Sequence, residues 1–363
     1  MRIGLLNGGG DCPGLNAVTH GVVATAARLG WEVLGFRDGY EGLLSPGDYK
    51  LLQVEKTEGI LKLGGTILGT SNRGHFAGKV GEGGVRKIPD ELMQDAFRTL
   101  RRLGVSALVC VGGDGSLTTA LQFHEEGFPV VGVPKTIDND LQATATTFGF
   151  DSAVQVVTDS LDRLHTTAES HSRVMVLEVM GRHAGWIALY GGIAGGASSI
   201  LIPEIPFSYE SVAESILRRE RIGFRSSLVV VAEGAAPAGG CHVVEDSGGG
   251  GEVRLGGIGD VVAAKLAELT GKETRCTRLG HLQRGGSPTC LDRVLGMRFG
   301  VEAVKLIEEK RFGRMVSYQQ YHVSSVLIED AVRKLKLVDP GGEIVEAAKS
   351  VGICFGDQAN ERN

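Results

Sequence analysis

The stretch VSALVCVGGDGS, residues 105–116, joins an apolar run to a glycine-rich turn. Residues 105–111 are apolar at every position except Ser106, as expected for a strand buried on both faces of a parallel sheet. Helical spacing of apolar residues begins at Ser116 and continues to Glu126. Glycines allow a tight turn between the two elements and expose backbone amides to a ligand. The stretch therefore predicts a strand, a phosphate-binding turn and a helix.

The same alternation extends outward from this stretch in both directions. The expected strands cover residues 3–6, 31–36, 129–133, 174–179, 199–202, 228–232 and 322–327, and the expected helices cover 16–29, 89–103, 152–167, 184–193, 209–221, 258–269 and 291–309. Buried strands joined by amphipathic helices are typical of parallel sheets covered on both faces. We therefore predict an α/β fold with two Rossmann-like lobes, mainly parallel sheets and an active site in the cleft between the lobes.

Charge and composition exclude several classes of function. The chain has 38 Lys and Arg against 43 Asp and Glu, a net charge of −5, so we expect no nucleic-acid partner and no anionic membrane surface. No apolar run approaches the ~20 residues of a membrane span, and we expect no secretion signal. The six cysteines form no CxxC pair, and several lie in apolar runs, which predicts reduced core thiols in a cytoplasmic protein.

Two further polar turns follow predicted strands. Residues 7–14, NGGGDCPG, offer backbone amides to a phosphate but match neither dinucleotide-binding nor P-loop spacing. Residues 134–140, PKTIDND, place two carboxylates, a hydroxyl and a cation within seven residues, a set that suits a general base, a metal ligand and a phosphate clamp. Each turn alone is also compatible with a structural role, such as a tight turn, a helix cap at Asp114 or an Asx turn.

Arginine-containing segments recur between the predicted elements. They are residues 71–74, 171–173, 180–182, 273–275 and 281–286. A single arginine is usually a solvated surface residue, but several beside glycines and strand ends favour a site that holds more than one phosphate. Glu233 ends a predicted strand, where a carboxylate can accept hydrogen bonds from sugar hydroxyls or cap a loop.

Taken together, these motifs occur in the order found in the phosphofructokinase family, which the chain resembles over residues 3–306. The NAD and diacylglycerol kinase group is similar only in the GGDG turn at 112–115. The resemblance implies a glycolytic kinase that transfers the γ-phosphoryl group of ATP to the 1-hydroxyl of fructose 6-phosphate, with Mg²⁺. It also implies a homodimer or homotetramer, in which Arg173 and Arg275 complete the site of the neighbouring subunit.

The resemblance further implies a role for each matching residue. The implied catalytic residues are Asp138 as base, Thr136, Arg182 and Lys135; the implied donor-binding residues are Gly10, Arg73, Gly74, Gly113, Asp114, Gly115 and Ser116. The implied substrate-binding residues are Thr136, Ile137, Asp138, Arg173, Met180, Gly181, Arg182, Glu233, Arg275, His281, Leu282, Gln283 and Arg284. Asp114 is the implied metal ligand, with Asp140 as a water-mediated helper.

The choice of donor depends on two positions. Family members that use pyrophosphate resemble this chain at Lys135 but commonly carry aspartate where Gly115 stands. A carboxylate there would crowd and repel the α-phosphate of ATP, so we expect ATP, with pyrophosphate as the alternative and ADP left open. The residues leave open which effectors act and whether sedoheptulose 7-phosphate is accepted, and a non-catalytic sugar-phosphate sensor is the rival of another class. The helix after the first turn lacks the cations that hold an allosteric nucleotide in bacterial relatives, so we doubt control of that type.

Domain boundaries are expected where the strand and helix pattern shifts from one lobe to the other. We assign residues 1–150 and about 259–320 to a larger donor-binding lobe. Residues 151–258 and about 321–345 form the smaller lobe, which we expect to bind fructose 6-phosphate, and 346–363 form a C-terminal tail.

Overall fold

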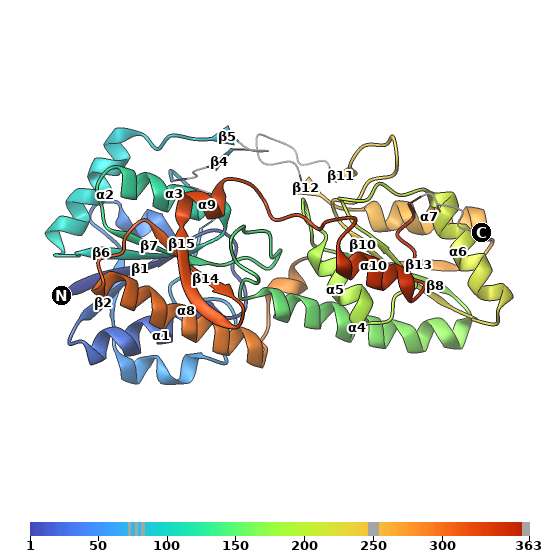
Figure 1. Ribbon diagram of the computed structural model, residues 1–363, viewed down its shortest axis with the longest axis horizontal. Helices are drawn as coiled ribbons and strands as arrows, with labels where there is room; N and C mark the ends of the chain where they lie inside the picture. The colour runs from blue at the N-terminus through green and yellow to red at the C-terminus, as the bar shows by residue number, and fades with distance from the viewer. Residues whose placement is uncertain (72–73, 77–78, 81–83, 246–253, 358–363) are drawn as a thin grey trace. The chain divides into compact units, whose positions relative to one another are not determined.

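The computed structural model describes residues 1–71, 74–76, 79–80, 84–245 and 254–357 (Figure 1). The chain forms two compact units. Unit 1 consists of Met1–Ile137, Leu141–Ser152 and Arg284–Leu335, and unit 2 of Asp138–Asp140, Ala153–Gln283 and Lys336–Asn363.

Unit 1 is built around a seven-stranded sheet in the order β15-β14-β7-β6-β1-β2-β3. The strands are β1 (Arg2–Asn7), β2 (Glu32–Phe36), β3 (Tyr49–Leu52), β6 (Ala107–Gly112), β7 (Val130–Pro134), β14 (Arg314–Gln319) and β15 (His322–Leu327). The five strands from β14 to β2 run parallel, and the outer strands β15 and β3 pair antiparallel with their neighbours. The prediction of a mainly parallel α/β fold is confirmed.

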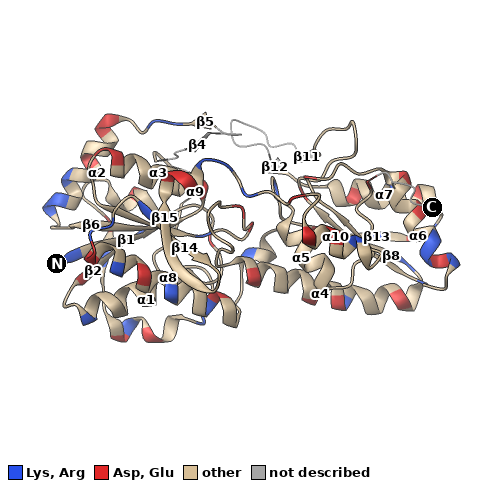
Figure 2. Ribbon diagram, in the orientation of Figure 1, with Lys and Arg blue, Asp and Glu red and all other residues tan. Residues whose placement is uncertain are grey.

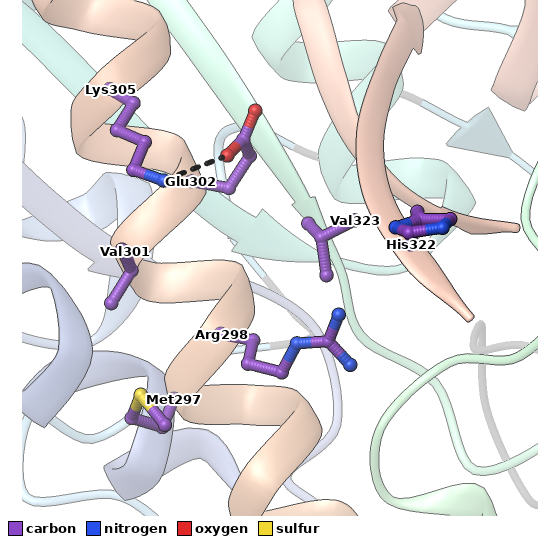
Figure 3. Close-up of a pocket in the computed structure, with 7 residues that line it drawn as sticks. All are labelled: Met297, Arg298, Val301, Glu302, Lys305, His322 and Val323. Carbon is purple, nitrogen blue, oxygen red and sulfur yellow. Dashed lines mark ion pairs between the residues drawn. The ribbon is translucent and has the colours of Figure 1, made fainter.

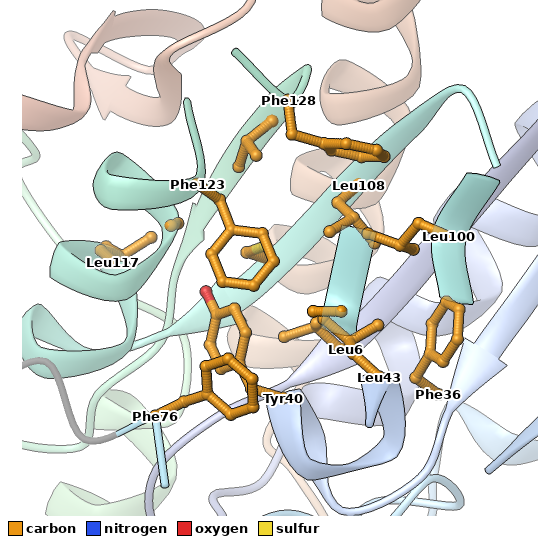
Figure 4. Packing of buried hydrophobic residues seen from close by; sticks show 14 of the residues in the cluster. Leu6, Phe36, Tyr40, Leu43, Phe76, Leu100, Leu108, Leu117, Phe123 and Phe128 are labelled. Carbon is orange, nitrogen blue, oxygen red and sulfur yellow. The ribbon is translucent and has the colours of Figure 1, made fainter. Parts of the chain in front are cut away.

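Helices cover both faces of this sheet. Helices α1 (Leu15–Arg28) and α8 (Cys290–Glu308) pack together on one face, and α2 (Asp90–Arg102), α3 (Asp114–Glu125) and α9 (Ile328–Val332) lie on the other (Figure 1). The core beneath α2 and α3 is aromatic, with the Phe123 ring 5.4 Å from that of Tyr40 and 5.5 Å from that of Phe97 (Figure 4). Burial of such large apolar side chains is a main source of folding free energy.

Unit 2 contains a four-stranded parallel sheet in the order β13-β8-β10-β9. Its strands are β8 (Val174–Val179), β9 (Ser199–Leu201), β10 (Ser227–Ala232) and β13 (Thr274–Arg278), and its helices are α4 (Phe150–His171, which begins in unit 1), α5 (Trp186–Ala194), α6 (Tyr209–Arg221), α7 (Ile258–Thr270) and α10 (Glu343–Ser350). Helix α7 packs on β8 and β13 and against α6, and α5 packs on β9 and β10. Two short hairpins add β4 (Lys79–Val80) with β5 (Gly84–Val85), and β11 (Val244–Glu245) with β12 (Arg254–Leu255).

The observed units differ from the expected boundaries in four places. Residues 138–140, which include the implied base, belong to unit 2, although the larger lobe was expected to reach residue 150. Residues 259–283 belong to unit 2, because β13 pairs with β8; its sequence, TRCTR, lacks the apolar run that marks a buried strand. Residues 321–335 belong to unit 1, because β15 forms a hairpin with β14, which pairs with β7. The described part of the expected tail, residues 346–357, is docked on unit 2, where the amide of Cys354 donates to Ser198 O at 3.0 Å.

The cysteines follow the prediction only in part. All six thiols are free, but only Cys12 and Cys110 are buried. Cys241 and Cys290 are exposed, so the expectation of six core thiols is wrong for these two. Of the helices that the structure describes, none has both the length and the apolar composition needed to cross a bilayer.

Candidate active site

Three of the predicted turns lie at one edge of the unit 1 sheet. Strands β7, β6 and β1 are parallel neighbours, so the turns that follow them begin at the same edge. The carboxyl ends of parallel strands are where open α/β sheets bind ligands. Lys and Arg are interspersed with Asp and Glu along the helices of both units, so an anion must be held by local groups (Figure 2).

The first two turns are packed against each other by glycines. A Cβ on Gly8 would lie 2.9 Å from the Cβ of Ser116, and a Cβ on Gly112 would overlap the same side chain. The amide of Gly8 donates to Val111 O at 2.8 Å, and the hydroxyl of Tyr40 donates to Ser116 O at 2.8 Å. The aromatic core therefore fixes the turn through Tyr40, and the glycines allow the close approach.

Gly115 differs from these packed glycines. It is the second residue of α3, its φ lies outside the left-handed region, and a Cβ there would have no described atom within 4 Å. Neither backbone conformation nor packing requires glycine at this position. An open space is left beside the N-terminus of α3, where partial positive charge favours an anion.

Asp114 is the first residue of α3, and the N-cap is Gly113. Asp114 Oδ1 accepts a hydrogen bond from the amide of Gly115 at 2.6 Å, and the Asp114 side chain is partly exposed. Among the described residues no group of three or more His, Cys, Asp or Glu could hold a metal ion. One carboxylate beside a phosphate-binding turn fits Mg²⁺, which usually takes one or two protein carboxylates together with phosphate oxygens.

Two cations gather at the first turn. Lys135 is 5% exposed and its Nζ donates to Gly10 O at 2.5 Å. Arg284 Nη1 donates to Asp11 O at 3.3 Å and lies 3.0 Å from the place of a Cβ on Gly10. We expected Arg284 beside the sugar-phosphate residues 281–283, but the structure places it in unit 1 with the first turn, whereas those residues belong to unit 2.

The remaining candidates in unit 1 differ in exposure, with Thr136 and Ile137 buried and Gly74 exposed. Thr136 is 9% exposed and its carbonyl accepts from the Thr147 hydroxyl at 2.7 Å. Ile137 is fully buried, so only its main chain is available to a ligand. Gly74 packs against Glu41, and Arg73 lies outside the described residues.

A second group of candidates lies at the carboxyl edge of the unit 2 sheet. Residues 180–182 follow β8, and Glu233 follows its neighbour β10. The amide of Glu233 donates to Val179 O at 2.8 Å, and that of Gly234 to Gly181 O at 3.2 Å. Met180, Arg182 and Glu233 are all partly exposed at this edge. The structure therefore brings residues 180–182 and Glu233 together within unit 2.

The segment after β13 is divided between exposed and buried side chains. His281 and Leu282 are exposed, the latter by 69%. Gln283 is fully buried, and its Nε2 donates to Gly280 O at 3.2 Å. Gln283 therefore supports this segment from inside, and its side chain is not available to a ligand.

Arg173 and Arg275 lie at the opposite, amino edge of the same sheet. Arg173 precedes β8, and Arg275 is the second residue of β13. The six residues of β8 separate Arg173 from Met180, a span of about 20 Å at the rise of an extended strand. Within one chain, these two arginines are therefore remote from the carboxyl-edge group.

An acidic residue that the sequence analysis did not single out pairs with both arginines. Glu273 Oε1 lies 2.8 Å from Arg173 Nη2 and 2.5 Å from Arg275 Nη2. The hydrogen bond from Arg173 lowers the pKa of Glu273, which keeps this carboxylate charged. No sequence signal marks the contact, because it depends on the parallel pairing of β8 with β13.

A pocket of about 330 Å³ lies elsewhere in unit 1, between α8 and β15 (Figure 3). Its cations already have partners. Arg298 donates to Tyr321 O at 3.2 Å, and Lys305 lies 3.9 Å from Glu302. None of the predicted site residues lines this pocket, so we do not place the chemistry there.

Comparison with known proteins agrees with the motifs. A family model described as Phosphofructokinase matches residues 2–307. The ATP-dependent 6-phosphofructokinase of Chloroflexus aurantiacus is 51% identical over 363 residues, which cover 99% of this chain and 98% of that protein. The pyrophosphate–fructose 6-phosphate 1-phosphotransferase of Amycolatopsis methanolica is 50% identical over 343 residues, covering 94% and 97%.

Solved structures share the fold. Pichia pastoris phosphofructokinase in the T-state has a TM-score of 0.79 and 32% identity, with 97% of this chain aligned to 36% of that longer chain. A pyrophosphate-dependent phosphofructokinase from Marinobacter aquaeolei has a TM-score of 0.78 at 22% identity, covering 98% and 88%. The family model spans most of the chain, and the relatives match it nearly from end to end, so the chain belongs to the phosphofructokinase family.

Proposed function

We propose that the protein is a 6-phosphofructokinase that transfers the γ-phosphoryl group of ATP to the 1-hydroxyl of fructose 6-phosphate, giving fructose 1,6-bisphosphate in glycolysis. Relatives with this activity in their names match the chain at about 50% identity, as do relatives named for pyrophosphate. The open space beside Gly115 is the observation that carries the choice of ATP. No fold requirement explains this glycine, whereas room for the α-phosphate of a nucleotide does.

In this proposal unit 1 binds the donor. The amides of Gly10 and Gly113 receive its phosphate oxygens, together with the N-terminus of α3, whereas the amides of Gly8, Gly9 and Gly115 already donate within the fold. Lys135, already directed at the first turn, stabilises the charge on the transferred group. Mg²⁺ held by Asp114 and the donor phosphates, with Asp140 acting through water, would neutralise further negative charge.

Residues of unit 2 bind and activate the sugar phosphate. Asp138 takes the proton of the sugar 1-hydroxyl as the hydroxyl oxygen attacks the γ-phosphorus. The bond between the γ-phosphorus and the oxygen that bridges it to the β-phosphate breaks, and ADP leaves with that oxygen. Arg182 donates to the transferred phosphoryl group, and Glu233 accepts from sugar hydroxyls. Positioning of this kind supplies most of the rate enhancement in phosphoryl transfer.

The two amino-edge arginines support a homo-oligomer. At about 20 Å from the carboxyl-edge group, Arg173 and Arg275 suit the phosphate of a sugar bound to a second copy of the chain. Dimer and tetramer both satisfy this argument. A cytoplasmic location is part of the proposal, and the six free thiols fit a reducing compartment.

Pyrophosphate is the second candidate donor, and Lys135 is the observation that favours it. Its Nζ lies at the first turn, where a cation would suit a small, highly charged donor. Aspartate at position 115 would strengthen that reading, but the chain carries glycine. A sugar-phosphate sensor is a weaker rival, because both Asp138 and Asp114 are present.

The test is steady-state turnover of fructose 6-phosphate with Mg²⁺ and, in separate assays, ATP, ADP or pyrophosphate. Formation of fructose 1,6-bisphosphate is followed. We expect turnover with ATP. Turnover with pyrophosphate alone would overturn our reading of Gly115 but keep Asp138 as base. Binding of fructose 6-phosphate without turnover by any donor would favour the sensor.

A further inference from the structure

The loop that carries the proposed base has an unusual centre. Asn139 lies between Asp138 and Asp140 and has a φ of +52°, in the left-handed region. It is 4% exposed, whereas both flanking aspartates are partly exposed. Asparagine tolerates this conformation better than most residues, but a buried left-handed residue still needs support from its surroundings.

That support comes from a lysine far away in the chain. Lys336 Nζ donates to Asn139 Oδ1 at 3.0 Å, and its backbone amide donates to Asp140 O at 2.7 Å. The adjoining residues continue the same contact, because Leu335 forms an antiparallel bridge with Leu141. Two segments that are remote in sequence therefore run side by side at the base-carrying loop.

Lys336 is itself held in place by unit 2. Its carbonyl accepts from Trp186 Nε1 at 2.8 Å, and its Nζ lies 5.8 Å from the centre of that ring. Two residues further on, the amide of Val338 donates to Glu204 at 2.8 Å, and Glu204 also accepts from the amide of Gly185 at 3.0 Å. The lysine is therefore clamped to the start of α5 on one side and to the loop on the other.

The environment of Lys336 is unusual for a cation. Burial lowers the pKa of its ammonium group to about 8, and the nearby carboxylate of Asp140 acts in the opposite direction. Lys336 is partly exposed, and a partly desolvated ammonium group is favourable only where polar or charged partners surround it, so its contacts explain why a lysine stands here. Among the contacts described, its partners on the loop are the side-chain oxygen of Asn139 and the main-chain carbonyl of Asp140.

We propose that Lys336 is a positioning residue for the phosphoryl transfer: through Asn139 it fixes the backbone on which Asp138 and Asp140 are carried. The inference rests on the proposed function and adds a residue to it. Lys336 acts on the loop and need not touch either substrate. A shift of about 1 Å in a catalytic group can lower a rate by about 10²-fold, so a loosened loop should lower kcat.

The main test replaces Lys336 with methionine, which keeps most of the chain length and removes the charge and the donor. We expect kcat to fall by about 10- to 100-fold, while the KM for fructose 6-phosphate stays within about threefold. Lys334→Met is the matched control, because Lys334 is an exposed lysine two residues away. This control should keep the wild-type kcat.

A second variant separates positioning from folding. Asn139→Gly keeps the left-handed conformation but removes the acceptor of the lysine, so its kcat should fall as in Lys336→Met. If the lysine acts through Asn139, the double variant should lose little more than either single variant. The inference would be overturned if the loss of kcat in the double variant equalled the product of the two single losses. A wild-type kcat in Asn139→Gly or in a folded Lys336→Met would also overturn it.

Thermal midpoints of all variants are measured by circular dichroism. If Lys336→Met does not fold, the kcat of Asn139→Gly alone decides the matter. If the wild-type protein fails to turn over fructose 6-phosphate with any of ATP, ADP and pyrophosphate, the proposed function is refuted, whichever result the variants give. An active wild type with unchanged variants would refute only the role of Lys336.

Discussion

The two candidate binding edges are built in different ways. In unit 1 the turns after β1 and β6 are formed by backbone, and glycines pack them around Ser116. At the amino edge of unit 2 the candidate side chains are instead held by another side chain, since Glu273 pairs with both Arg173 and Arg275. A donor carrying several phosphates suits many amides, whereas a single base or a single sugar phosphate needs charged groups placed one by one. The comparison indicates that glycine turns in a sequence predict a site for a ligand with several phosphates. A site for a single sugar phosphate depends instead on charged side chains and their ion pairs.

The largest expected effect is at the base. Asp138→Asn keeps the size of the side chain but removes its ability to take a proton, so we expect kcat to fall by about 10³-fold or more. Calorimetric binding of fructose 6-phosphate should change little, because the loop is also held at its two following residues. Retention of more than a tenth of the wild-type kcat would show that another group accepts the proton.

One buried side chain in unit 1 forms the kind of contact that its donor turns make through the backbone. Asp292, in the first turn of α8, accepts from the amide and the hydroxyl of Ser152, at 2.8 and 2.6 Å. Burial raises its pKa from 3.8 to about 6, although these hydrogen bonds oppose the shift. A buried carboxylate thus joins the starts of α4 and α8 in unit 1, whereas the candidate donor turns are joined by main-chain contacts.

The folded state binds this proton more tightly than the unfolded state. The resulting contribution to stability is therefore fully present below about pH 4 and is lost as pH rises through about 6. The loss amounts to about 3 kcal/mol, an order-of-magnitude figure. Denaturant unfolding of the wild type and Asp292→Asn at pH 4 to 7 measures it. The wild type should lose about 3 kcal/mol relative to the variant, and a constant difference would show that the carboxylate titrates normally.

The third prediction sharpens the contrast among glycines of unit 1. Gly115→Asp places a carboxylate in open space, so the fold should persist while kcat/KM for ATP falls by about 10²-fold through repulsion of phosphate. Gly115→Ala should keep the thermal midpoint. Gly112→Ala is the opposite control, because its Cβ would overlap Ser116 and overpacking lowers the free energy of unfolding by about 1–3 kcal/mol. Wild-type use of ATP by Gly115→Asp would refute the steric argument.

Sequence reasoning succeeded where one residue type or one run encodes the structure. The predicted bounds of β8 and α6 match those observed, because a run that is apolar except at Glu178 and a 3.6-residue period are local signals. Edge strands β3 and β13 were missed, because an edge strand carries polar residues on its open side.

The same distinction applies to the candidate site. The glycine turns could be predicted, since glycine itself allows the close backbone contacts found at Gly8 and Gly112. Glu273 and Lys336 could not, because each acquires its partners only when strands or segments that are distant in the chain pair. The contact of Arg284 with the first turn was not predicted for a related reason, since the chain passes from unit 2 to unit 1 between it and Gln283.

The smallest expected effect concerns the ion pairs at the amino edge of unit 2. Glu273→Gln removes the negative charge shared by Arg173 and Arg275 but keeps the shape of the side chain. All three residues are partly or fully exposed, and solvent screens exposed ion pairs, so we expect only a few-fold change in binding.

The direction of that change distinguishes two roles for Glu273. As a competitor of the sugar phosphate it weakens binding, so Glu273→Gln should lower the KM for fructose 6-phosphate about threefold at low salt, with kcat unchanged. The effect should shrink in about 0.5 M salt, because screening reduces the interaction of exposed charges. Glu268→Gln on α7 is a matched control, since Glu268 pairs only with the exposed Lys265 among the ion pairs described. A raised KM in Glu273→Gln would instead mean that the carboxylate orients the two arginines, and the amino edge would then be preorganised like the glycine turns of unit 1.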